Sequence, residues 1–173
     1  MHVVLIRHAE AGDRDVFART GAPDAERPVT AKGKKQMRRA ARGLGTLVPA
    51  IDRLATSPYR RAAQTARIVA RVYDDLAPVV VEQLIPDVEP PLVARWLRGQ
   101  RGADTIALVG HEPQLSALAT FLLTASSEPI LALDKGAACA IDLPASRRAG
   151  TLLWLLTARQ LRALGKRPRN HTG

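Results

Sequence analysis

Apolar runs alternate with amphipathic stretches from the first residues of this 173-residue chain onward, and this alternation restricts its possible folds more than any other feature. Short apolar runs indicate buried strands, and apolar side chains at helical spacing indicate helices that pack on a sheet. We expect strands at about residues 2–6, 52–56, 79–82, 105–109, 137–142 and 151–156. Strands and helices that take turns are typical of the α/β class, which is the predicted fold class.

Two helices have N-terminal signals in the sequence. Thr30 can cap a helix that runs to about Leu47. Ser57 can cap a second helix, because Pro58 follows at the position that proline favours. Apolar stripes are expected along this second helix and along a helix after Pro113, at Ala62, Ala66, Val69 and Tyr73 and at Leu115, Leu118, Ala119 and Leu122.

The length fits one domain with its own hydrophobic core. We expect this domain to span residues 1–165 and the basic residues 166–173 to form a flexible tail. Segment 11–29 has no apolar period and mixes Gly, Pro, Asp and Arg, which predicts a long surface loop. Loops of this length are usually functional or mobile.

Cysteine content and charge bear on location and partners. Cys139 is the only cysteine, which excludes an internal disulfide and fits a reducing compartment. No stretch approaches the length of a membrane span, and the first apolar run is too short for a signal peptide, so we expect a cytoplasmic protein with no membrane partner.

The formal net charge of +10 attracts polyanions. Because the arginines are scattered, nucleic-acid binding is not expected.

Three strand ends carry side chains that suit an anion. Arg7 and His8 directly follow the first predicted strand. Ser57 and Arg61 follow the second, with Arg61 in the first turn of the expected helix, and His111 follows the fourth. Ligands bind at the carboxyl ends of the strands in open α/β sheets, so we expect these side chains at one edge. Such a cluster would repel itself unless an anion lay within it.

Phosphate fits this set of side chains. An arginine fork pairs with two phosphate oxygens at once, and a neutral imidazole can attack phosphorus to form a covalent intermediate. A P-loop is excluded because Pro28 stands where glycine is needed before Gly33. A cysteine phosphatase is excluded because Ala145, and not arginine, stands six residues after Cys139. No metal-ligand spacing is present and arginines repel cations, so we expect no metal and no cofactor.

Three stretches resemble the signatures of the histidine phosphatase superfamily, also called the phosphoglycerate-mutase-like superfamily: residues 5–10 (LIRHAE), 57–66 (SPYRRAAQTA) and 109–113 (VGHEP). Residues 27–33 (RPVTAKG) resemble a further landmark, so the similarity covers about residues 1–156. The short length and the absence of lid insertions make the chain most similar to the SixA-type phosphohistidine phosphatases. This resemblance implies a three-layer α/β/α sandwich around a mostly parallel sheet of about six strands with an antiparallel edge.

The resemblance also implies roles for the side chains at the strand ends. By position, His8 is the phosphorylated nucleophile and His111 a further donor to the transferring group. Arg7 and Arg61 are the phosphate clamps. Such a pocket works mainly by positioning and by neutralising the charge on the phosphoryl oxygens.

The chain departs from the family pattern at several positions. Ala9 replaces the usual glycine after the nucleophile, and Arg14 stands where many relatives carry a phosphate-binding asparagine. Arg14 is either a substitute phosphate-binding cation or a loop charge. Pro86 stands where many members carry a carboxylate that protonates the leaving group. Asp87 and Glu89 lie nearby and are the candidates for a substitute general acid.

A missing acid bears on the substrate. General acid catalysis is worth about 10²–10⁴-fold, so poor leaving groups suffer most from its absence, whereas phosphohistidine can release a neutral imidazole if its ring is already protonated. The leading hypothesis is a metal-independent phosphatase that acts on protein phosphohistidine through a covalent phosphohistidine intermediate. The alternatives are a small-molecule phosphomonoesterase, acting on a sugar phosphate or nucleotide, and a phosphate- or nucleic-acid-binding module without turnover.

Overall fold

The computed structural model describes residues 1–126, 128–144 and 149–166. The strands are β1 (His2–Arg7), β2 (Arg53–Thr56), β3 (Val79–Val80), β4 (Thr105–Gly110), β5 (Ala138–Asp142) and β6 (Thr151–Leu156). The helices are α1 (Arg14–Ala18), α2 (Ala31–Leu47), α3 (Arg60–Ala70), α4 (Pro90–Arg98), α5 (Gln114–Thr124) and α6 (Ala158–Leu164), with 3₁₀ turns η1 (Asp24–Glu26) and η2 (Glu82–Leu84). The predicted tail lies, apart from Lys166, outside the described residues.

Within the described residues one sheet has six strands in the order β3-β2-β4-β1-β5-β6. Strands β1 to β4 run parallel, with Val4 beside Ala107 in the central pair. The pairings of β5 with β1 and with β6 are antiparallel. The predicted mostly parallel sheet with an antiparallel edge is therefore confirmed.

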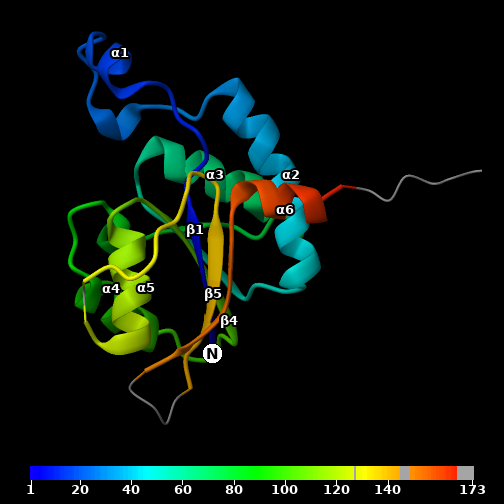
Figure 1. The fold of residues 1–173 in the computed structure, drawn as a ribbon. Helices are drawn as coiled ribbons and strands as arrows, with labels where there is room; N and C mark the ends of the chain where they lie inside the picture. Colours follow the sequence, from blue (N-terminus) through cyan, green and yellow to red (C-terminus); the bar gives the residue numbers. More distant parts are fainter. Residues whose placement is uncertain (127, 145–148, 167–173) are drawn as a thin grey trace, which may run out of the picture.

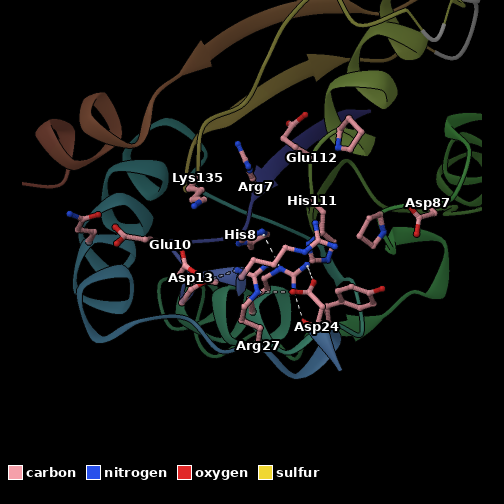
Figure 2. A pocket seen from close by; sticks show the side chains of 18 residues that line it. Arg7, His8, Glu10, Asp13, Asp24, Arg27, Asp87, His111, Glu112 and Lys135 are labelled. Atoms are coloured by element: carbon pink, nitrogen blue, oxygen red, sulfur yellow. Dashed lines mark hydrogen bonds and ion pairs between the residues drawn. The ribbon is translucent and has the colours of Figure 1, made fainter. Parts of the chain in front are cut away.

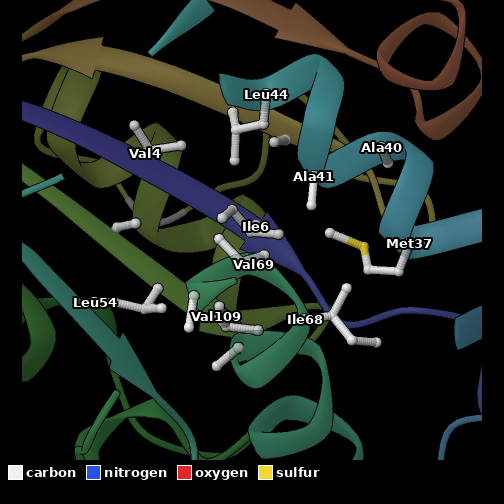
Figure 3. Packing of buried hydrophobic residues seen from close by; sticks show 14 of the residues in the cluster. Val4, Ile6, Met37, Ala40, Ala41, Leu44, Leu54, Ile68, Val69 and Val109 are labelled. Carbon is white, nitrogen blue, oxygen red and sulfur yellow. The ribbon is translucent and has the colours of Figure 1, made fainter. Parts of the chain in front are cut away.

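Successive side chains of each strand point to opposite faces of the sheet, and both faces are covered by helices (Figure 1). Val4 and Ile6 of β1 pack with residues of α2, α3 and α6, as Figure 3 shows for the first two helices. Val3 and Leu5 pack with residues of α4 and α5 on the other face. The chain is thus the predicted three-layer α/β/α sandwich, and Cys139 is a buried residue of β5.

Two helix predictions need correction. Helix α3 begins at Arg60 and not directly after Ser57, because the Ser57 hydroxyl accepts a hydrogen bond from the Tyr59 N–H and does not cap the helix. Segment 11–29 is not a plain loop, since it contains α1 and η1 and is closed at its base by a bridge between Ala11 and Val29. Helices α4 and α6 were not among the predicted elements. No helix among the described residues is long and apolar enough to cross a membrane.

Candidate functional site

A pocket of about 940 Å³ lies at the carboxyl ends of β1, β2 and β4 (Figure 2). Arg7 is the last residue of β1, and His8 follows it. His111 follows the end of β4, and Arg61 lies in the first turn of α3. The structure therefore brings together in one pocket wall four of the five side chains that the sequence places at strand ends. The fifth, Ser57, is buried and contacts His111.

His8 is buried and its ring is held from two sides. Its Nδ1 lies 2.7 Å from the backbone oxygen of Ala9, which can only accept, so Nδ1 carries the proton. Nε2 is then an unprotonated acceptor, and Arg61 Nε donates to it at 3.3 Å. Burial lowers the pKa of His8 to about 4, against the opposing effect of the Ala9 hydrogen bond and with help from the charges of Arg61 and Arg7. At neutral pH His8 is a neutral imidazole whose Nε2 lone pair accepts from Arg61, another residue of the pocket wall.

Arg61 is buried and held by Asp24. Its Nη1 donates to the Asp24 backbone oxygen at 2.8 Å, and its Nη2 lies 3.0 Å from Asp24 Oδ2. The guanidinium carbon lies 5.0 Å from the centre of the Tyr59 ring, within the range of a cation–π contact. Arg61 is thus fixed in place beside His8.

Arg7 and His111 each keep a nitrogen free for another partner. Arg7 Nη1 donates to the Leu133 backbone oxygen at 2.6 Å, whereas its Nε is buried with no hydrogen-bond partner among the described residues. His111 Nε2 lies 2.9 Å from the Ser57 hydroxyl, and its buried Nδ1 likewise has no partner in the described part of the chain. Burial places the pKa of His111 well below its usual range, so the ring is neutral. An anion between these groups would find the Arg7 Nε donor unused, and also His111 Nδ1 in the tautomer that protonates this nitrogen.

The remaining predicted residues are all exposed. Arg14 is an exposed residue of α1 that lines the pocket. Asp87 is exposed and lines the pocket beside Pro86, apart from the cluster around His8 (Figure 2). Glu89 is the residue that precedes α4 and is not part of the pocket wall. The geometry thus leaves Asp87 as the better placed of the two candidate acids.

Sequence reasoning missed Asp24 and Arg27, although both line the pocket (Figure 2). Arg27 Nε donates to Asp24 Oδ1 at 2.7 Å, and Arg27 Nη1 donates to the Gly12 backbone oxygen at 2.7 Å. The three-residue spacing of the pair is a weak signal, because it is equally common among exposed charges. Glu112 also lines the pocket, where burial raises its pKa.

The protonation state of His8 gives a first testable prediction. In an NMR titration of histidine-labelled protein, the His8 ring should stay neutral from pH 7 to about pH 5 and take up its proton only near pH 4. The unfolded chain protonates this side chain near pH 6.5, so the unfolded state binds more protons over this interval. Acidification should therefore destabilise the folded state between these values. Proton uptake near pH 6.5, assigned by its loss in His8→Ala, would contradict the buried neutral ring.

Among the described residues no group of three or more His, Cys, Asp or Glu side chains is placed to hold a metal ion. The pocket is open to a ligand and holds nitrogen donors around the unprotonated Nε2 of His8. This arrangement can bind a tetrahedral oxyanion and place its central atom next to His8 Nε2.

Comparisons with known proteins agree with this chemistry. The family model of the histidine phosphatase superfamily (branch 1) matches residues 3–86. An uncharacterized protein of Picosynechococcus is 34% identical over 117 residues, which are 66% of this chain and 68% of that protein. The phosphohistidine phosphatase SixA of Escherichia coli is 26% identical over 160 residues, 91% and 94% of the two chains.

Among solved structures, the protein histidine phosphatase SixA complexed with tungstate superposes with a TM-score of 0.77 and 27% identity. The match covers 93% of this chain and 99% of that one. The resemblance seen in the sequence is thereby confirmed across the whole fold and is not confined to the motifs. The chain belongs to the histidine phosphatase superfamily, and it is a phosphatase.

Proposed function

We propose that this phosphatase hydrolyses phosphohistidine on a protein substrate, without a metal and through a phosphoryl intermediate on His8. The observation that carries the proposal is the state of His8 Nε2, an unprotonated nitrogen beside the Arg61 guanidinium in a pocket shared with Arg7 and His111. A nucleophile held neutral in this way needs no base to remove a proton before it attacks.

The reaction has two displacement steps. The Nε2 lone pair of His8 forms a bond to phosphorus while the bond from phosphorus to the leaving group breaks, and the leaving group departs with that electron pair. Arg61, Arg7 and His111 bind the three non-bridging oxygens, whose charge they offset in the transition state. Water then attacks phosphorus, the bond to Nε2 breaks, and the ring returns to its neutral form as phosphate and a proton are released.

Two carboxylates of the pocket are already ion-paired, which makes them poor general acids. Asp24 is ion-paired with Arg61, and Glu10 is paired with Lys32 at 3.3 Å. Pro86 stands where family members carry the acid, and it lines the pocket. Phosphohistidine with a protonated ring releases neutral imidazole, so its leaving group needs no proton from a general acid. Similarity over 91% of the chain to a protein named phosphohistidine phosphatase supports the same substrate class.

Leaving-group dependence tests the substrate class. We expect kcat/KM for a phosphohistidine-bearing protein to exceed that for an alkyl phosphate by about 10²–10⁴-fold, the usual value of general acid catalysis. The measurement is steady-state phosphate release with EDTA present. Asp87→Asn should leave the phosphohistidine reaction within about two-fold of wild type. Equal turnover of the alkyl phosphate, together with its loss in Asp87→Asn, would contradict the proposal.

One observation favours a second candidate, a small-molecule phosphomonoesterase. Asp87 is an exposed carboxylate in the pocket wall next to Pro86, where it could protonate an alkoxide leaving group. In that case the alkyl phosphate would be the better substrate, and its hydrolysis would depend on Asp87. The same two measurements therefore separate the two candidates.

A further inference from the structure

Segment 11–29 places one carboxylate between two guanidinium groups of the pocket. Asp24, the first residue of η1, has Oδ1 2.7 Å from Arg27 Nε and Oδ2 3.0 Å from Arg61 Nη2. The Asp24 backbone oxygen takes a further donor of Arg61, Nη1, at 2.8 Å. All three nitrogens of Arg61 are thus engaged, two by Asp24 and one by His8.

These Arg61 donors are the ones that a phosphoryl group would use. Carboxylate and phosphoryl oxygens bind the same N–H edge of a guanidinium fork, so Asp24 Oδ2 and a phosphoryl oxygen compete for Nη2. Burial alone would raise the pKa of Asp24, but the Arg27 hydrogen bond and the charge of Arg61 outweigh it and lower the pKa. The competitor is therefore an anion at neutral pH.

Arg27 can keep its ion pair with Asp24 when a phosphoryl group binds Arg61. Arg27 is anchored separately, by Nη1 on the Gly12 backbone oxygen. If a phosphoryl oxygen replaces Asp24 Oδ2 on Arg61, the Oδ1 contact with Arg27 can remain. The backbone oxygen of Asp24 can likewise continue to hold Arg61 Nη1. The exchange thus costs one ion pair and leaves the segment in place.

We propose that Asp24 is a positioning residue that exchanges with the phosphoryl group on Arg61. It orients Arg61 in the empty pocket, gives up Nη2 to the incoming phosphoryl oxygen and takes it back as product phosphate leaves. The negative charge of Asp24 consequently weakens the binding of free phosphate and limits product inhibition. The role of this exchange in turnover rests on the proposed function. The competition between Asp24 and an anion for Arg61 does not, because it can be measured with inorganic phosphate alone.

Asp24→Asn tests the exchange, because it keeps an acceptor and the backbone contact while it removes the charge. We expect the dissociation constant of inorganic phosphate, measured by calorimetry on the full chain, to fall about ten-fold or more, since a like charge near the anion is lost. The inhibition constant of phosphate should fall by the same factor. Asp24→Glu, which restores the charge, should return both constants to within about three-fold of wild type.

Glu26→Gln is the matched control. Glu26 lies in the same turn, is exposed, pairs with Arg60 at 3.9 Å and is not part of the pocket wall. Its loss should change phosphate affinity by less than about two-fold. Unchanged or weaker phosphate binding in folded Asp24→Asn would overturn the proposal, because a purely structural role predicts weaker binding. If wild type binds phosphate but turns over no phosphorylated substrate, the proposed function is wrong. The phosphate dissociation constant of Asp24→Asn still decides whether Asp24 competes for Arg61.

Discussion

His8→Ala is expected to lose phosphatase turnover by a factor on the order of 10⁴–10⁶, the range seen when a covalent nucleophile is removed from an enzyme. The physical reason is that, among the described residues, no second imidazole nitrogen is hydrogen-bonded to Arg61 in the place of His8 Nε2. His111 Nε2 is engaged by Ser57, and the His111 ring centre lies 5.1 Å from that of His8. The check is steady-state phosphate release from a phosphohistidine protein and from p-nitrophenyl phosphate.

His2→Ala is the control for this substitution. His2 is an exposed histidine at the opposite end of β1 and is not part of the pocket wall. Its replacement should leave turnover unchanged. A His8→Ala protein that is folded and retains more than about a tenth of wild-type turnover would show that His8 is not the nucleophile.

Arg61→Ala is expected to lower kcat/KM by about 10²–10³-fold, as loss of a preorganised donor to a developing charge usually does. The substitution removes the donor beside His8 Nε2, and among the described residues it leaves the Asp24 carboxylate with Arg27 alone as its ion-pair partner. Arg61→Lys should recover only part of the loss, because an ammonium lacks the planar fork. The measurement is kcat/KM with the same two substrates.

Arg60→Ala is a closely matched control for Arg61. Arg60 is adjacent in α3, but its side chain is about half exposed and outside the pocket wall. We expect a change of less than about two-fold for Arg60→Ala. Similar losses in the two variants would indicate that the helix start, and not the Arg61 guanidinium, carries the effect.

The strand-end residues of the site could be predicted because the sequence pattern located the strands of the sheet. Buried apolar runs located β1 and β4 to within a residue, and parallel strands present their carboxyl ends at one edge. That is enough to bring Arg7, His8 and His111 together without knowledge of any loop. Arg61 followed because it lies in the first turn of a helix that continues from β2.

Asp24 could not be predicted, because its contact with Arg61 spans 37 residues and depends on how segment 11–29 folds back over the pocket. No apolar period reveals α1 or η1, whose residues include no buried side chain. Helix α6 was missed for a different reason: Leu161 is its one buried residue, too little for a stripe, although Thr157 and Gln160 form a capping box at its start. Ser57 was misassigned because a serine before proline suits a cap, whereas here its hydroxyl contacts His111.

The most direct test of the account is to trap the intermediate. Wild-type protein should be mixed with phosphohistidine substrate, quenched in base within a turnover, and mapped by mass spectrometry. We predict a phosphoryl group on His8, absent from His8→Ala and not found on His111. Phosphate release by wild type with no phosphorylated His8 at any quench time, or with the phosphoryl group on another residue, would contradict the central claim that His8 Nε2 is the nucleophile.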